Sequence, residues 1–201
     1  HSSVLENFYT YTPGLHVVAP ATAADMRGLL KTAVRSDDPV IFLEHEKIYA
    51  MKGELAEPEN SDYVVPFGKA RLVESAEPAQ LTILCWSMAY YHVIQAVERL
   101  RAENIHADVL DLRSLKPVDS EAIIAAAAKT HRLLIVQEAT PVASYGSWLS
   151  HHIQDIAFDE LDAPVAVVSS DDVPMPYAFS LEPQVLPNGD RIVAAAKSLV
   201  A

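Results

Sequence analysis

Residues 81–104 read "LTILCWSMAYYHVIQAVERLRAEN", and this stretch joins the two patterns that decide the fold class. Its first part, 81–87, is a short and almost entirely apolar run, which is typical of a strand buried on both faces. The part that follows places Ala89, Val93 and Ala96 on one face of a helix. A buried strand that leads directly into an amphipathic helix is typical of a parallel sheet covered by helices.

The same alternation extends to both sides of this stretch. Near the start, a strand, a helix and a second strand follow one another within the length of a βαβ unit. Thr22, with Asp25 three residues later, is a typical start for that helix. The sequence therefore predicts an α/β fold with a mostly parallel sheet covered by helices on both faces. The further strands are expected at 15–20, 40–44, 106–114, 132–139 and 163–170, and the further helices at 22–34, 119–129, 145–158 and 189–200.

Residues 50–66, "AMKGELAEPENSDYVVP", interrupt this alternation. They contain two prolines, a glycine and several acidic residues without an apolar period, which is typical of an exposed connection. We therefore expect a domain boundary near Pro66, with one domain at 1–65 and a second at 66–201.

Charge and composition exclude several classes of function. The chain has 15 Lys and Arg against 27 Asp and Glu, a formal net charge of -12, which opposes binding to nucleic acid and favours a basic protein partner. No apolar stretch approaches the roughly 20 residues needed to cross a bilayer. The single Cys85 lies in an apolar run, so it is expected to be a buried thiol in a reducing compartment.

Polar residues stand at or just beyond the carboxyl ends of the expected strands, where parallel sheets bind their ligands. They are Asp111, Arg113, Glu138 and Asp171, and the alternative interpretation is that they are caps and surface charges. The sequence contains no GxGxxG, GxxxxGK[ST] or GxSxG motif, which argues against a nucleotide bound by this chain alone and against a serine hydrolase. The "EHE" at 44–46 could bind a cation or could be a solvated strand end.

Several longer stretches resemble one known family. They are "HSSVLENFYTYTPGLHVVAP" at 1–20, "VLDLRSLKPVD" at 109–119, "RLLIVQEA" at 132–139 and "DVPMPYA" at 172–178. Together they resemble the β subunits of the thiamin diphosphate-dependent decarboxylase component of 2-oxo acid dehydrogenase complexes. The resemblance implies part of a pyrimidine-binding domain followed by a transketolase C-terminal-type domain. On this resemblance we expect the glutamate that activates the aminopyrimidine ring to lie upstream of residue 1.

The resemblance also implies a function. It predicts an α2β2 heterotetramer that decarboxylates a 2-oxo acid and passes the acyl group to lipoyllysine, with pyruvate or acetoin favoured over branched-chain acids. Thiamin diphosphate would be shared with the α subunit, Mg²⁺ would lie in the α subunit, and K⁺ would be structural. The implied location is the bacterial cytoplasm or the mitochondrial matrix or another organelle.

The resemblance assigns one catalytic residue. His1 matches the histidine of the family's HSQ motif, which lies in the active-site channel and helps in proton transfer during acylation of the lipoyl group. An imidazole titrates near neutrality and suits that role. Ser3 replaces the usual Gln of the motif, which changes the local hydrogen bonding.

Two further sites follow from the resemblance. The main-chain carbonyls of Ala33, Ser36 and Asp38 match a loop that holds K⁺, and the rival interpretation is an ordinary end of a helix. Asp162, together with the C-terminal carboxylate of Ala201, matches the position that docks the basic subunit-binding domain of the acyltransferase.

Two other functions stay open at this point. The first is a non-catalytic module that dimerises and docks the acyltransferase core, and the second is a relative of transketolase or deoxyxylulose-phosphate synthase. An upstream strand and helix that carry a glutamate would favour the enzyme over the module.

Overall fold

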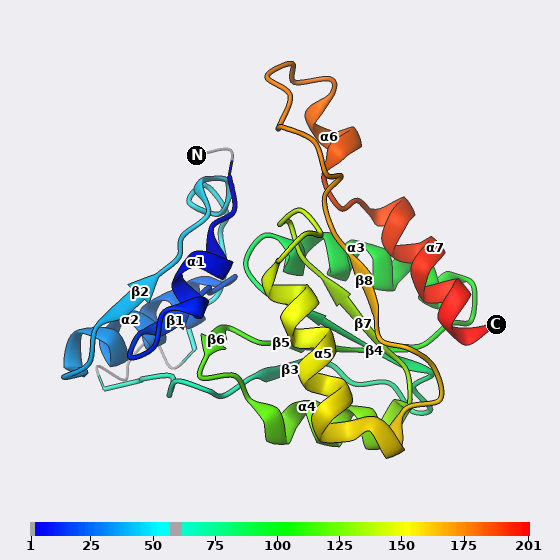
Figure 1. The fold of residues 1–201 in the computed structure, drawn as a ribbon, viewed down its shortest axis with the longest axis horizontal. Coiled ribbons are helices and arrows are strands. Elements are labelled where there is room, and N and C mark those ends of the chain that lie inside the picture. Colours follow the sequence, from blue (N-terminus) through cyan, green and yellow to red (C-terminus); the bar gives the residue numbers. More distant parts are fainter. Residues whose placement is uncertain (1–2, 57–61) are drawn as a thin grey trace.

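The computed structural model describes residues 3–56 and 62–201, which form two sheets lying side by side (Figure 1). The larger sheet has five strands, all parallel except β3 at its edge. In spatial order its strands are β3 (Arg71–Glu74), β5 (Ala107–Asp111), β4 (Leu81–Cys85), β7 (Leu133–Val136) and β8 (Ala166–Val168). This arrangement confirms the predicted α/β class with a mostly parallel sheet.

Helices cover both faces of the larger sheet. One face carries α4 (Ser120–Thr130) and α5 (Tyr145–Ala157), and the other carries α3 (Ala89–Ala102) and α7 (Gly189–Val200). Successive side chains of a strand point to opposite faces, so Leu84 and Ile135 pack with α4 and α5, whereas Ile83 packs with α3 and α7. This double burial explains why the central strands are nearly continuous apolar runs.

The register of the parallel strands brings their carboxyl ends to one edge. Cys85 of β4 pairs with Asp111 of β5, and Leu84 pairs with Ile135 of β7. The residues that follow these strands therefore gather at the same edge, where they meet the N-terminal part of the chain.

The N-terminal part contains α1 (Glu6–Tyr11), β1 (His16–Val18), α2 (Ala23–Arg35), β2 (Val40–Phe42) and the short 3-10 helix η1 (Glu46–Ile48). β1 and β2 are parallel, as expected for a βαβ unit. The predicted start of α2 is also found, because the Thr22 hydroxyl accepts a hydrogen bond from the Asp25 amide.

A strand from the second half of the chain completes the smaller sheet. β6 (Ser114–Lys116) pairs antiparallel with β1, with Val18 opposite Ser114. Three residues without an apolar alternation gave no strand signal in the sequence, so β6 was not predicted. Its pairing joins the two halves of the chain through main-chain hydrogen bonds.

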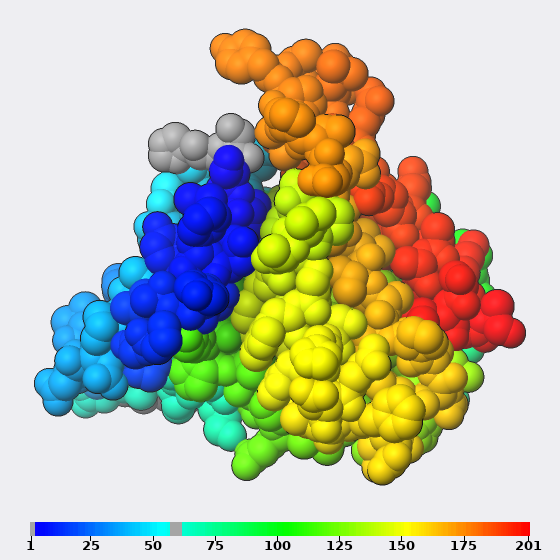
Figure 2. All heavy atoms as spheres, in the orientation of Figure 1, coloured from blue at the N-terminus to red at the C-terminus, as the bar shows by residue number. Residues whose placement is uncertain are grey.

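The segment after β8 projects from the body as an arm that contains α6 (Glu182–Val185), orange in Figures 1 and 2. Its Tyr177 and Phe179 are fully or almost fully exposed. At its base Arg191 pairs with Asp171 at 3.2 Å. Within residues 3–56 and 62–201, no helix combines the length and apolar character needed to span a bilayer.

Candidate functional site

Five residues from separate elements meet where the N-terminal part contacts the carboxyl edge of the larger sheet. We call them the interface cluster. They are Glu6 of α1, His45 before η1, Trp86 after β4, His92 of α3 and Glu138 after β7. Figure 2 shows the N-terminal segment in blue packed directly beside the yellow-green segment that follows β7. The cluster thus joins residues that are far apart in the sequence.

Glu6 is the innermost acid of this cluster. Its side chain is buried, and the Trp86 indole Nε1 donates a hydrogen bond of 2.6 Å to Oε1. Its other oxygen, Oε2, has no hydrogen-bond partner among the described residues. Burial raises the pKa of Glu6 to about 7, and nearby Glu138 adds to this, whereas the Trp86 hydrogen bond and His45 act in the opposite direction. Near neutral pH a substantial fraction of Glu6 is therefore a neutral acid.

Glu138 lies between two imidazoles. The Nε2 of His45 is 3.1 Å from one carboxyl oxygen, and the Nε2 of His92 is 3.9 Å from the other. The Nδ1 of His45 accepts a hydrogen bond from the Lys47 amide, so a neutral His45 carries its proton on Nε2, facing Glu138. Burial lowers the pKa of His92, although Glu138 partly opposes this.

The cluster thus brings together two carboxyl groups and two imidazoles, of which Glu6 has a pKa raised to about 7 by burial. A group with a perturbed pKa among other titratable side chains is a candidate for acid–base chemistry. The described part of the chain contains no set of three His, Cys, Asp or Glu side chains arranged to hold a metal ion. Within the cluster, His45 of the "EHE" motif lies against Glu138.

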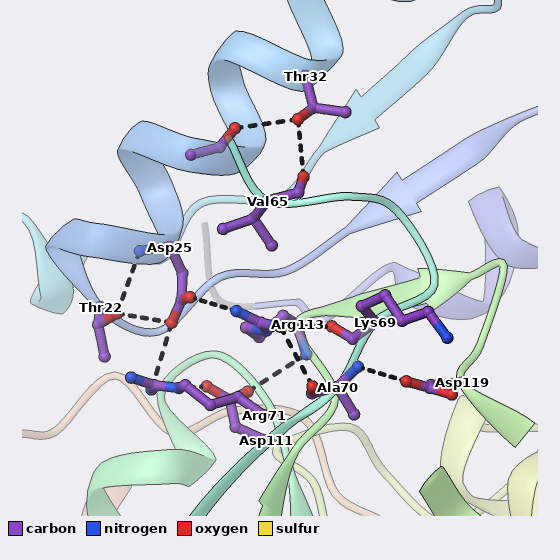
Figure 3. A network of polar contacts seen from close by, with 11 residues as sticks. Thr22, Asp25, Thr32, Val65, Lys69, Ala70, Arg71, Asp111, Arg113 and Asp119 are labelled. Carbon is purple, nitrogen blue, oxygen red and sulfur yellow. Dashed lines mark hydrogen bonds and ion pairs between the residues drawn. The ribbon is translucent and has the colours of Figure 1, made fainter. Parts of the chain in front are cut away.

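A second network, which we call the ion network, links α2 to the larger sheet (Figure 3). Arg113 Nη1 lies 2.8 Å from one oxygen of Asp25, and Arg71 Nη2 lies 3.2 Å from the other. The same Arg71 nitrogen is 3.2 Å from Asp111. Arg113 also donates to the Lys69 carbonyl through Nε and Nη2. Two acids and two guanidinium groups thus pair with one another across the chain.

Burial dominates the electrostatics of the ion network. It raises the pKa of Asp111 to about 7, together with the neighbouring Asp25, whereas Arg71 and Arg113 lower it. The partners of this network lie within the chain, which is typical of a structural link. Asp111 and Arg113, two of the generic ligand positions, are buried and paired with partners within the chain, so they are not the surface charges of the alternative interpretation. Asp171 pairs with Arg191 at the base of the arm.

The loop predicted to hold K⁺ follows α2. The Ser36 amide donates to the Ala33 carbonyl at 3.2 Å, and the Asp38 amide donates to the Ser36 hydroxyl at 3.2 Å. The Asp38 carboxylate lies 3.3 Å from His16. The last carbonyls of a helix lack intrahelical partners, and a carbonyl that accepts one hydrogen bond keeps a second lone pair. The main-chain carbonyl oxygens of this loop are therefore suitable ligands for a hard cation.

The residues expected to bind a partner are accessible. Asp162 is about half-exposed, and Arg132 of the same chain lies 3.6 Å from its carboxylate. Ala201 is exposed, and its amide donates to the Lys197 carbonyl that ends α7. His1, the expected catalytic residue, lies outside the described residues, and Ser3 is exposed.

Glu6 and Trp86 were not predicted as site residues from the sequence. Glu6 is a single acid among apolar and aromatic residues at the start of a short helix, and that context is the available signal for burial. Trp86 was recognised only as part of a buried strand. Neither pattern shows that the two side chains meet, because they lie 80 residues apart and the contact depends on how the halves pack.

Comparison with known proteins agrees with this architecture. The sequence profile described as "Transketolase, C-terminal domain" matches residues 68–192, and that described as "Transketolase, pyrimidine binding domain" matches residues 1–52. The chain belongs to the transketolase C-terminal domain family. Within it, the chain is a homologue of the pyruvate dehydrogenase E1 component β subunits, which confirms the family resemblance seen in the sequence.

Three relatives illustrate this homology. The protein from Rhizobium meliloti is 40% identical over 199 residues, which covers 99% of this chain and 42% of the relative. The mitochondrial protein from Dictyostelium discoideum is 41% identical, with coverage of 98% and 55%, and that from Porphyra purpurea is 40% identical, with coverage of 100% and 59%. The chain spans about half the length of the curated relatives it matches.

A solved structure shares the fold. It is described as "Split gene transketolase, inactive beta4 tetramer" and superposes with a TM-score of 0.76 at 24% identity. The match covers 98% of this chain and 61% of that one, and at this identity it shows the fold alone.

Proposed function

We propose that this chain is the β-type component of a thiamin diphosphate-dependent 2-oxo acid dehydrogenase, with pyruvate as the favoured substrate. The observation that carries this proposal is an identity of about 40% to pyruvate dehydrogenase E1 β subunits over 98–100% of this chain. The relatives come from bacteria and from mitochondria, among others, and we propose the bacterial cytoplasm or the mitochondrial matrix as the location.

The proposed reaction decarboxylates the 2-oxo acid and transfers the acyl group to lipoyllysine. Thiamin diphosphate, when bound, supplies the carbon nucleophile of the decarboxylation. We assign its diphosphate and Mg²⁺ to an α subunit in an α2β2 heterotetramer, and we assign no residue of this chain to cofactor binding. We propose the domains 1–65, completing the pyrimidine-binding domain, and 66–201, the transketolase C-terminal-type domain.

His1 is the proposed catalytic residue of this chain. Its imidazole would donate or accept a proton as the lipoyl group is acylated, because imidazole exchanges protons near neutral pH. Glu6 lies on α1, the helix that follows His1 in the sequence, and is a second acid–base residue of this part of the chain.

We propose K⁺ as a structural ion held by the main-chain carbonyls of Ala33, Ser36 and Asp38. The end of α2 supports this proposal, since its carbonyls carry a partial negative charge that favours a cation. Exchange of K⁺ for choline at constant ionic strength should lower the thermal midpoint of the protein. An unchanged midpoint, together with density for water alone in this loop, would contradict the ion site.

We propose that Asp162 and the Ala201 carboxylate dock the basic subunit-binding domain of a dihydrolipoyl acyltransferase. The net charge of -12 supports a basic partner. Because Arg132 lies near Asp162, the partner would compete with an ion pair that is already present in the chain.

The function is tested by His1→Ala in the complete assembly. Loss of a positioned acid or base is expected to reduce lipoyl-dependent turnover about 10²-fold, whereas His151→Ala, at an exposed imidazole on α5, should leave it unchanged. If His1→Ala has full turnover, the catalytic role is wrong. If the assembly binds the acyltransferase but has no 2-oxo acid activity, the docking module is the better description.

A further inference from the structure

We propose that Glu6 is a positioning residue: its hydrogen bond to Trp86 fixes α1, the helix that follows His1 in the sequence, against the carboxyl edge of the larger sheet. The inference rests on the proposed function for its link to catalysis, because that function gives His1 its role. Its structural part concerns residues that the structure describes.

The partner of Glu6 is rigidly held. Trp86 follows β4 directly, its side chain is buried, and its ring meets that of Tyr145 edge to face at 5.3 Å. The Tyr145 hydroxyl in turn donates to the Leu115 carbonyl at 2.7 Å. A hydrogen bond from this indole therefore connects α1 to the core of the larger sheet.

Other contacts also hold α1: Tyr9 packs against the hydrophobic core, and further hydrogen bonds are made by Asn7 and Lys116. Asn7 donates to the Ala143 carbonyl at 3.2 Å in an exposed position. Lys116 of β6 donates to the carbonyls of Thr10 and Thr12 at 2.7 and 2.8 Å, at the far end of the helix. Glu6 is thus the buried contact at the N-terminal end of α1. A helix of six residues has little stability of its own, so such contacts determine its position.

The surroundings of Glu6 explain why a buried carboxyl group can accept the hydrogen bond from Trp86. Its titratable neighbours are Glu138, His45 and Tyr145. Because burial favours the neutral acid, Glu6 can accept the indole hydrogen bond through Oε1 without carrying a full buried charge. Glutamine has the same shape and a carbonyl oxygen in the same place. It should therefore replace Glu6, whereas alanine should not.

The structural part is tested by amide hydrogen exchange of α1 in three variants. Glu6→Ala should make the α1 amides exchange about tenfold faster, the expected effect of losing one buried hydrogen bond. Trp86→Phe keeps an aromatic ring but removes the donor, so it should have the same effect even if the alanine variant folds poorly. Glu6→Gln should exchange like the wild type. Wild-type exchange in Glu6→Ala and Trp86→Phe would overturn the proposal.

A spectroscopic signature separates this contact from simple packing. In a Trp148→Phe background Trp86 is the remaining tryptophan, since the chain has two. Its fluorescence should change with pH as Glu6 titrates, and this change should disappear in Glu6→Gln. A transition that persists unchanged in Glu6→Gln would show that Trp86 responds to another group and would overturn the assignment.

The catalytic part is tested in the complete assembly. Glu6→Ala should lower kcat for lipoyl acylation about tenfold with little change in KM for the 2-oxo acid, and Glu6→Gln should restore it. If His1→Ala lowers turnover but Glu6→Ala does not, the positioning role is wrong. If His1→Ala has no effect, the proposed catalytic role of His1 fails, and the exchange rates of α1 still decide whether Glu6 fixes the helix.

Discussion

Replacing Glu6 by Gln should stabilise the protein at alkaline pH and have a much smaller effect in acid. The folded protein raises the pKa of Glu6 from 4.5 to about 7, mainly through burial. Stability from the neutral acid is therefore fully present below pH 4.5 and is lost as pH rises through about 7. Since one pKa unit is worth about 1.4 kcal/mol, the full loss is about 3 kcal/mol, of which about 2–3 kcal/mol falls between pH 5 and pH 8.

The assay is urea unfolding at pH 5 and pH 8, followed by circular dichroism. The stability advantage of Glu6→Gln over the wild type should grow by about 2–3 kcal/mol between the two conditions. Asp111 also has a raised pKa, but it is present in both proteins and cancels in the difference. Glu121→Gln, at an exposed position on α4, is the matched control and should show no such growth. An advantage of Glu6→Gln that is equal at both pH values would refute the reasoning.

Three further predictions follow from individual contacts. Ala143 has a φ of 50°, so Ala143→Gly should stabilise the protein by about 0.5–1 kcal/mol in thermal unfolding; a loss of stability would contradict this strain. Arg113→Met leaves the buried Asp25 without its closest cation and should cost about 3–5 kcal/mol, while a cost below about 1 kcal/mol would show that the ion network is dispensable. Asp162→Arg should weaken binding to the basic acyltransferase domain, most strongly at low salt, and an unaltered dissociation constant would argue against docking at this position.

The sequence predicted those strands and helices whose apolar residues recur at a regular spacing. The central strands β4 and β7 are nearly continuous apolar runs because helices cover both of their faces, and α3 was visible from Val93 and Ala96 on one face. β3 and β6 were missed because an edge strand and a three-residue strand leave no comparable pattern. Their pairing is decided by partners distant in the sequence.

The candidate site was predicted only in part. Glu138 stands at the end of a recognisable strand, so the predicted topology was enough to place it at the carboxyl edge of the sheet. Glu6 and His45 could not be connected with it, because they come from the other half of the chain and meet it only after the halves pack. Conversely, Asp111 and Arg113 stand at equally generic positions, but the structure joins them to Asp25 and Arg71 in a structural network.

The central claim is that this chain works in a thiamin diphosphate-dependent 2-oxo acid dehydrogenase. The most direct measurement is carbon dioxide release from carboxyl-labelled pyruvate by the complete assembly of this chain with an α subunit, with and without thiamin diphosphate. We expect release that requires both the α subunit and the cofactor, and that exceeds release from branched-chain 2-oxo acids. Release that does not depend on thiamin diphosphate, or the absence of release from every 2-oxo acid, would contradict the claim.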